Sequence, residues 1–133
     1  MSKEEMVQFF GEPISSYSRA EAIEDGVLND VTETAKEAGF RFPVCLTAGV
    51  WEKCVEIPEG VEMQDEDGRL WDVLYMAAHA VRRAPVGADS VPFRVHVRND
   101  NRNRIPPAVE LVAMIHGGDN GEPVFTIMLP GED

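Results

Sequence analysis

The first 85 residues repeatedly place apolar side chains three or four positions apart, which is the spacing of one helical face. Polar residues that can cap a helix precede these stretches, and Gly39 and Pro58 follow two of them as stop signals. Ser18 and Glu21 also have the spacing of a capping box. We therefore predict three short helices, at about 19–25, 31–38 and 48–57, with Ser18, Asp30 and Thr47 as N-caps.

A longer amphipathic helix is predicted from Asp67, as its N-cap, to Arg83. Two arginines in the last turn complement the helix dipole, and Pro85 closes the helix. Its apolar stripe has the spacing of a core-facing helix and consists of Leu70, Val73, Leu74, Ala77, Ala78 and Val81.

After residue 90 the apolar period changes from about 3.6 to 2, which is the period of a half-buried strand. Val91, Phe93, Val95 and Val97 alternate with polar residues or proline. Two more apolar runs follow, at 108–116 and 123–130, and the turn GGDNG separates them. The pattern predicts a single α+β domain over residues 1–133. About four helices, over about 15–85, would pack on a three-stranded antiparallel meander over about 90–130.

The composition of the chain predicts an acidic surface. The net charge is −12, and residues 1–72 hold 17 acids against 6 bases. A field of this sign repels nucleic acid and anionic membrane and favours basic partners. No apolar run spans a membrane and no secretory signal precedes the domain, so we expect a cytoplasmic protein. The candidate partner-binding acids are Glu56, Glu59, Glu62, Asp65, Glu66 and Asp67, with Glu24, Asp25 and Asp30 on the earlier elements.

The acidic run ends in DEDG, which invites comparison with a calcium loop. Placing Gly68 at the sixth position of an EF-hand puts Met63 at the first position and Leu74 at the twelfth. Neither side chain can bind calcium, so no metal site is predicted. The two cysteines, Cys45 and Cys54, lack metal-ligand spacing and are expected to be buried or half-buried thiols.

Known catalytic and cofactor fingerprints do not occur. The chain has no nucleophile elbow, Walker loop, GxGxxG, HExxH or paired CxxC. We therefore predict no catalytic residues and no cofactor, and we favour a protein that is not an enzyme.

Two constellations of side chains are candidate ligand sites. On the long helix, Trp71, Tyr75, His79 and Arg83 recur at helical spacing, and such a stripe could stack on a base or bind an anionic ring. Alternatively, the aromatic residues extend the core. On the first predicted strand the candidate anion-binding residues are Arg94, His96 and Arg98, which could instead guard a strand edge against aggregation.

Several stretches together resemble an uncharacterised family of small acidic proteins, a domain of unknown function that is associated with phages, plasmids and other mobile elements. They are FGEPISSYSRAEAIEDGVLNDVTETAKEAGFRFPV (10–44), VWEKCVE (50–56), DEDGRLWDVLYMA (65–77) and GEPVFTIMLPGED (121–133). The resemblance carries no catalytic residues over. It implies a setting in which small acidic proteins often inhibit host defences such as CRISPR or restriction systems.

Three functional hypotheses follow. The first is a non-enzymatic acidic binding protein, an anti-defence inhibitor that blocks a basic nucleic-acid-binding site of a host complex without binding nucleic acid itself. The second is a protein that binds a small, nucleotide-like ligand, or a minor enzyme, with Trp71, Tyr75 and His79. The third is a structural accessory subunit that forms a homodimer through an apolar patch.

Overall fold

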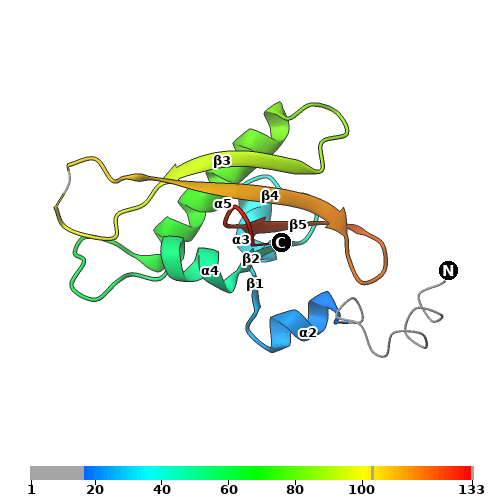
Figure 1. Cartoon of the computed structure of the whole chain (residues 1–133), viewed down its shortest axis with the longest axis horizontal. Helices are drawn as coiled ribbons and strands as arrows, with labels where there is room; N and C mark the ends of the chain where they lie inside the picture. Colours follow the sequence, from blue (N-terminus) through cyan, green and yellow to red (C-terminus); the bar gives the residue numbers. More distant parts are fainter. Residues whose placement is uncertain (1–16, 103, 133) are drawn as a thin grey trace.

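The structure, a computed structural model, describes residues 17–102 and 104–132, so the N-terminal stretch in which we looked for a signal sequence lies outside the described residues. Figure 1 shows the strands side by side, with α5 running behind β3 and β4 and α2 at the bottom of the view. The helical elements are α2 (Arg19–Glu24), α3 (Thr32–Glu37), α4 (Ala48–Val50), the π-helical segment η2 (Trp51–Val55) and α5 (Glu66–Arg83). The strands are β1 (Leu28–Asp30), β2 (Val44–Thr47), β3 (Ser90–His96), β4 (Ala108–Gly117) and β5 (Pro123–Met128).

The predicted fold is wrong, because the sheet has five strands and is mixed. Its order is β1-β2-β5-β4-β3. β2 runs parallel to β5, and the other neighbouring pairs are antiparallel. Helices and strands therefore alternate in the first half of the chain, where we predicted helices alone.

The two missed strands carry no strand signal of their own. β1 is the three-residue polar stretch LND, and we had assigned Asp30 to a helix cap. β2 is the run VCLT, in which three consecutive residues are buried. A strand buried on both faces does not alternate, so its pattern cannot be told from that of a short buried helix.

The core lies between one face of the sheet and the helices α3 and α5. Strand pairing aligns Leu46, Ile127, Ala113 and Val91 in one row across four strands, and all four side chains are buried. The predicted stripe of α5 packs against this face through Val73 and neighbouring residues. Burying one such side chain contributes about 1.5–3 kcal/mol, so this face holds the layers together.

The alternation predicted for β3 is present, with Val91, Phe93 and Val95 buried and the residues between them exposed. The third predicted helix, by contrast, is broken. After α4 the backbone continues as a π-helix, in which the Glu56 N–H donates to the Trp51 carbonyl. Because the helical segment ends here, the Cys54 and Glu56 carbonyls have no donor within the helix and are available to others.

Helix caps were predicted well in two cases and wrongly in two. Ser18 and Thr47 accept the hydrogen bonds expected of N-caps. The N-cap of α3 is Val31, although the Asp30 carboxylate still accepts from the Thr32 N–H at 3.0 Å. For α5 the cap is Asp65, not Asp67, because Asp65 has extended backbone and its carboxylate accepts from the Gly68 N–H. The helix therefore begins one turn earlier than its apolar stripe.

Candidate functional site

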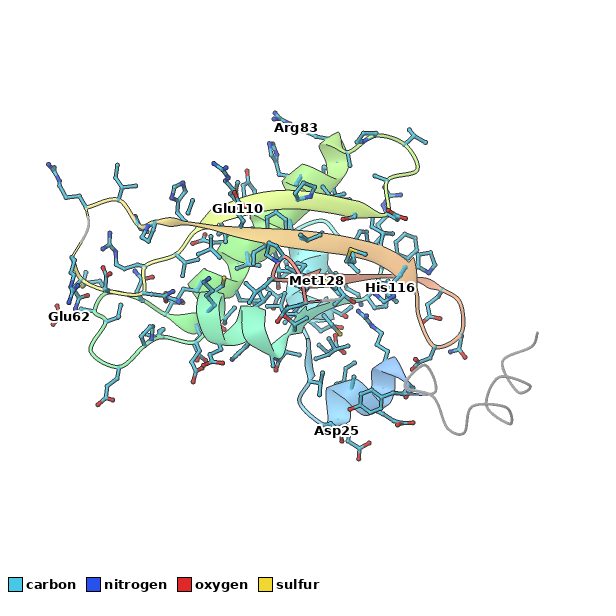
Figure 2. The ribbon with its side chains drawn as sticks, in the orientation of Figure 1. Asp25, Glu62, Arg83, Glu110, His116 and Met128 are labelled. Atoms are coloured by element: carbon cyan, nitrogen blue, oxygen red, sulfur yellow. The ribbon has the colours of Figure 1, made fainter. Side chains whose placement is uncertain are left out.

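All nine acids of the predicted binding surface are exposed, but they do not form one surface. In Figure 2, Glu62 lies at one end of the molecule and Asp25 lies beside α2, well away from it. Asp25 also accepts a hydrogen bond from the Tyr17 hydroxyl at 2.5 Å, and this bond raises the pKa of Tyr17 to about 12. The continuous candidate is therefore the acidic loop, defined here as residues 56–67.

A buried arginine holds the base of the acidic loop, and sequence reasoning did not single it out. Arg69, in the first turn of α5, is only 6% exposed. Its guanidinium donates to the carbonyls of Cys54 and Glu56, each at 3.1 Å, and also to the Arg98 carbonyl and the Asn99 side chain. It thus joins the end of η2, the start of the acidic loop and the end of β3.

Two asparagines of the loop between β3 and β4 attach it to the acidic loop and to η2, the segment just before it. The Asn101 amide donates to the Gly60 carbonyl at 2.8 Å and accepts from the Glu62 N–H at 3.1 Å. Asn99 donates to the Lys53 carbonyl at 2.8 Å. The acidic loop therefore has a defined path that side-chain amides impose on its backbone.

The ion pairs found within 4 Å among the described residues, Lys36–Glu33 and Arg94–Glu110, both involve acids outside the acidic loop. Within the loop, the Asp65 carboxylate accepts from the Gly68 N–H. Within residues 17–102 and 104–132, no three His, Cys, Asp or Glu side chains converge in a way that could hold a metal ion. The loop is thus a fixed, negatively charged surface at one end of the molecule.

The aromatic stripe of α5 lies on the outside of the helix. Trp71 and Tyr75 are 38% and 52% exposed, and their ring centroids are 6.2 Å apart with an interplanar angle of 30°. His79 and Arg83 are exposed on the same helix. The structure brings these four side chains onto one open surface, so the aromatic residues do not extend the core.

The three candidate anion-binding residues each contact a different part of the β3–β4 hairpin. Arg94 donates to Glu110 at 3.1 Å, and His96 Nδ1 lies 2.7 Å from the Pro106 carbonyl oxygen. Arg98 donates to the Arg104 carbonyl at 3.0 Å. Anion binding by this trio stays a prediction, and a bound anion would have to compete with these contacts.

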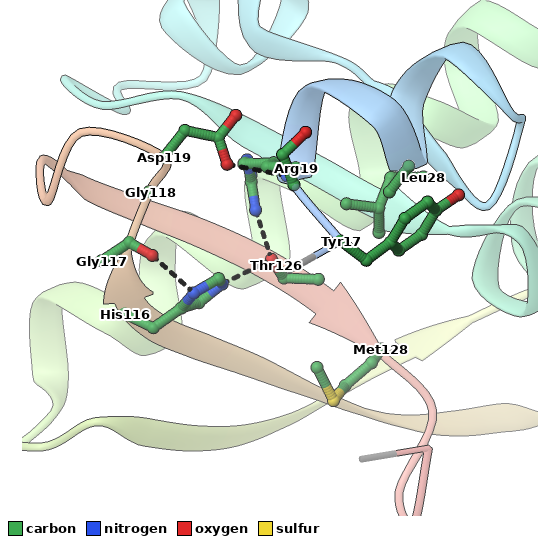
Figure 3. A pocket seen from close by; sticks show the side chains of 11 residues that line it. Tyr17, Arg19, Leu28, His116, Gly117, Gly118, Asp119, Thr126 and Met128 are labelled. Atoms are coloured by element: carbon green, nitrogen blue, oxygen red, sulfur yellow. Dashed lines mark hydrogen bonds between the residues drawn. The ribbon is translucent and has the colours of Figure 1, made fainter. Parts of the chain in front are cut away.

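A cavity of about 510 Å³ opens between α2 and the β4–β5 hairpin, on the face of the sheet opposite the core (Figure 3). Arg19 donates to the Thr126 hydroxyl at 2.7 Å and to the Phe125 carbonyl at 2.6 Å. The His116 ring reaches the same hydroxyl, with 2.7 Å between Nε2 and Oγ1. The Asp119 carboxylate accepts from the backbone N–H groups of Arg19 and Ala20.

The hydrogen bonds of this cavity define a proton arrangement. His116 Nδ1 lies 3.2 Å from the Gly117 carbonyl, which can only accept, so neutral His116 carries its proton on Nδ1. Nε2 then accepts from the Thr126 hydroxyl, whose oxygen accepts from Arg19. Both ends of the hydroxyl are satisfied in a buried side chain, so this cluster fastens α2 to the sheet. Its members are far apart in the sequence and match no motif, which is why the pattern did not reveal them.

These elements define an α+β protein with a mixed five-stranded sheet, a helical layer over the core face and an acidic loop fixed at one end. The chain belongs to the Family of unknown function (DUF6573), whose model matches residues 6–133. No curated protein and no solved structure matches it. Among the helices of the described residues, none has both the length and the hydropathy that crossing a bilayer requires.

Proposed function

We propose that this protein is a non-enzymatic binding protein whose acidic loop occupies a basic site on another protein. The observation that carries the proposal is the acidic loop itself, in which six exposed acids follow one another with no base between them. Such a surface speeds the encounter with a basic partner and disfavours partners of the same sign.

The anchoring of the loop supports the same proposal. Arg69 and Asn101 hold the loop backbone through hydrogen bonds to its carbonyl and N–H groups. A loop that is already ordered loses less conformational entropy when it binds, so more of the electrostatic attraction remains as affinity. The backbone positions from which the carboxylates extend are also set in advance, which favours a partner with a matching row of cations.

The specific partner we propose is a nucleic-acid-binding complex of a host defence system. The resemblance to proteins of phages, plasmids and other mobile elements supports this choice through its setting. An anti-CRISPR or antirestriction inhibitor with a row of carboxylates would compete with the phosphates of the target nucleic acid for the same lysines and arginines. Because both contacts are electrostatic, binding should weaken steeply as salt rises.

The test is cleavage of target DNA by purified CRISPR and restriction complexes, with and without this protein, at several salt concentrations. Glu56, Glu59 and Glu62 are changed together to lysine, and Asp65 is kept because it caps α5. We expect inhibition by the unmodified protein and loss of inhibition by this variant. The matched control reverses three exposed acids on α2 and α3, namely Glu21, Glu24 and Glu37.

The control has the same net charge as the loop variant, so it separates the position of the charge from its amount. Inhibition by the control and not by the loop variant would support the proposal. Inhibition that survives reversal of the loop acids would rule out the loop as the binding surface. If the protein inhibits none of the complexes tested, the proposed anti-defence function is wrong.

A further inference from the structure

The exposed face of α5 carries three kinds of side chain in order along the helix. Its first turns carry acids, with Asp67 and Asp72 exposed. Its middle carries apolar side chains that solvent reaches, and its last turns carry bases. The apolar residues are Trp71, Tyr75 and Met76, at 38%, 52% and 37% exposure, and the basic ones are His79 and Arg83.

This order makes the face complementary to itself when two copies of the helix run antiparallel. Residues 67, 71, 75, 79 and 83 form one i±4 ridge, which winds by about 160° around the helix. If two copies cross at about 50° from antiparallel, with the two-fold axis beside Tyr75, these ridges run along each other. Asp67 then lies opposite Arg83 of the second copy, and Trp71 lies opposite His79. Asp67 and Arg83 lie sixteen residues apart, about 24 Å along the helix, so the two charge pairs flank an aromatic centre.

We propose that two copies of this chain associate through this face, α5 against α5, in an antiparallel and two-fold symmetric pair. A two-fold interface uses the same surface on both copies, so ion pairs across it require both signs of charge within one patch. The exposed face of α5 meets that condition. It shares Asp67 with the acidic loop, whereas Glu56, Glu59 and Glu62, the acids that test the proposed function, lie outside it.

Other occupants fit this face less well. Nucleic acid or an anionic membrane would meet His79 and Arg83 favourably but would be repelled by Asp67 and Asp72. A strongly basic protein would be repelled at the opposite end. Trp71 and Tyr75, with ring centroids 6.2 Å apart, supply the apolar centre of the contact, and the charges around it would fix how the two copies are oriented.

Arg82 is not part of the proposed contact, because its guanidinium donates to the Ala38 carbonyl at 3.2 Å. The pair is small in area, and we expect association that depends on protein concentration in the micromolar range.

The experiment is sedimentation equilibrium of the full chain over a wide range of protein concentration. We expect a monomer–dimer equilibrium for the unmodified protein. Tyr75→Arg puts like charges together at the two-fold axis, and should give monomer at every concentration. Asp67→Lys alone and Arg83→Glu alone should each weaken the dimer by at least tenfold, because each creates two repulsive contacts.

The double variant Asp67→Lys with Arg83→Glu decides the register, because the attractive pairs reappear with their signs exchanged. We expect it to recover most of the affinity that either single variant loses. Glu24→Lys on α2 is the matched control for a change of charge, and thermal unfolding shows that each variant is folded. The proposal is wrong if the unmodified chain is monomeric throughout, or dimerises regardless of Tyr75. It is also wrong if the double variant recovers nothing.

Discussion

Arg69 shows how one residue can organise a loop without touching a ligand. Its guanidinium is surrounded by three backbone carbonyls and one asparagine side chain, and none of these acceptors carries a charge. A planar group with five N–H donors suits such a set, because it can satisfy carbonyls from three segments at once. The acidic loop depends on this residue more than on any of its own acids.

Replacing Arg69 should therefore destabilise the whole protein. Arg69→Met keeps much of the side-chain volume but leaves the carbonyls of Cys54, Glu56 and Arg98 without this donor. We expect a loss of about 3 kcal/mol in the free energy of unfolding, measured in urea. The exposed Arg102 is the control, and Arg102→Met should cost under about 0.5 kcal/mol. Equal losses in the two variants would contradict the anchoring role.

Gly39 is the second residue whose identity the structure explains. It has φ of +109°, and a Cβ there would lie 2.2 Å from Nη2 of Arg82, which donates to the Ala38 carbonyl. Any side chain therefore both strains the backbone and displaces the arginine that links the end of α3 to α5.

Gly26 offers a comparison, because its φ is +78° but a Cβ would meet nothing within 4 Å. We expect Gly26→Ala to cost about 1 kcal/mol of stability, from the backbone alone. Gly39→Ala should cost more, and the excess should shrink when Arg82 is also changed to alanine. Urea unfolding of these single and double variants measures the coupling. An unchanged excess in the double variant would show that Arg82 is not its cause.

At the scale of elements, α5 was predicted nearly whole because its signals are local. The apolar stripe, the two terminal arginines and Pro85 all lie within or next to the helix. The start was misplaced because the prediction took Asp67, the aspartate nearer to the stripe, as the cap, whereas Asp65 also precedes the stripe and can cap a helix. The backbone decided between them: Asp65 is extended, whereas Asp67 is already helical.

Substitution of the two aspartates separates these roles. Asp65→Ala should lower stability by about 1 kcal/mol, because the Gly68 N–H loses its acceptor. Asp67→Ala should cost about 0.5 kcal/mol or less, through the helix dipole alone. The measurement is thermal unfolding under dilute conditions, where any self-association through α5 is minimal. A larger loss of stability for Asp67→Ala than for Asp65→Ala would show that Asp67 is the N-cap, as the sequence pattern predicted.

At the scale of the whole molecule, the two buried cysteines lie on opposite faces of the sheet. Cys54 lies in η2, in the core beneath α5. Cys45 lies on β2, next to the edge strand β1, and faces away from that core. Burial raises the pKa of both thiols, that of Cys54 from 9.0 to about 11. The folded state thus favours the neutral thiol. The contribution of Cys54 to the free energy of unfolding should be fully present below pH 9 and should be lost as the pH rises toward 11.

The corresponding prediction concerns thiol reactivity. At pH 8 the native protein should react with a disulfide reagent far more slowly than the urea-unfolded chain, because the thiolate and the access it needs both require opening of the core. The rate should rise in parallel with global unfolding as urea is added. Fast reaction of Cys54 in the native protein would show that the helical layer opens locally, and fast reaction of Cys45 would show local opening on the other face of the sheet.

The local features of this protein could be predicted from its sequence, because short windows of residues determine them. The caps at Ser18 and Thr47, the stripe of α5 and the alternation of β3 depend on hydrogen bonds and periodicity within a few positions. Exposure of the acids was equally predictable, since unpaired carboxylates are rarely buried.

Only the tertiary structure decided how these elements combine. The strand β2 has no recognisable pattern, and its place is set by β1 and β5, which lie on either side of it. Arg69, Arg19, His116 and Thr126 acquire their roles from carbonyls and side chains that are distant in sequence. The physical reason is that burial and hydrogen-bond partners depend on the packing of the whole chain, whereas helix caps and periodicity depend on neighbours alone.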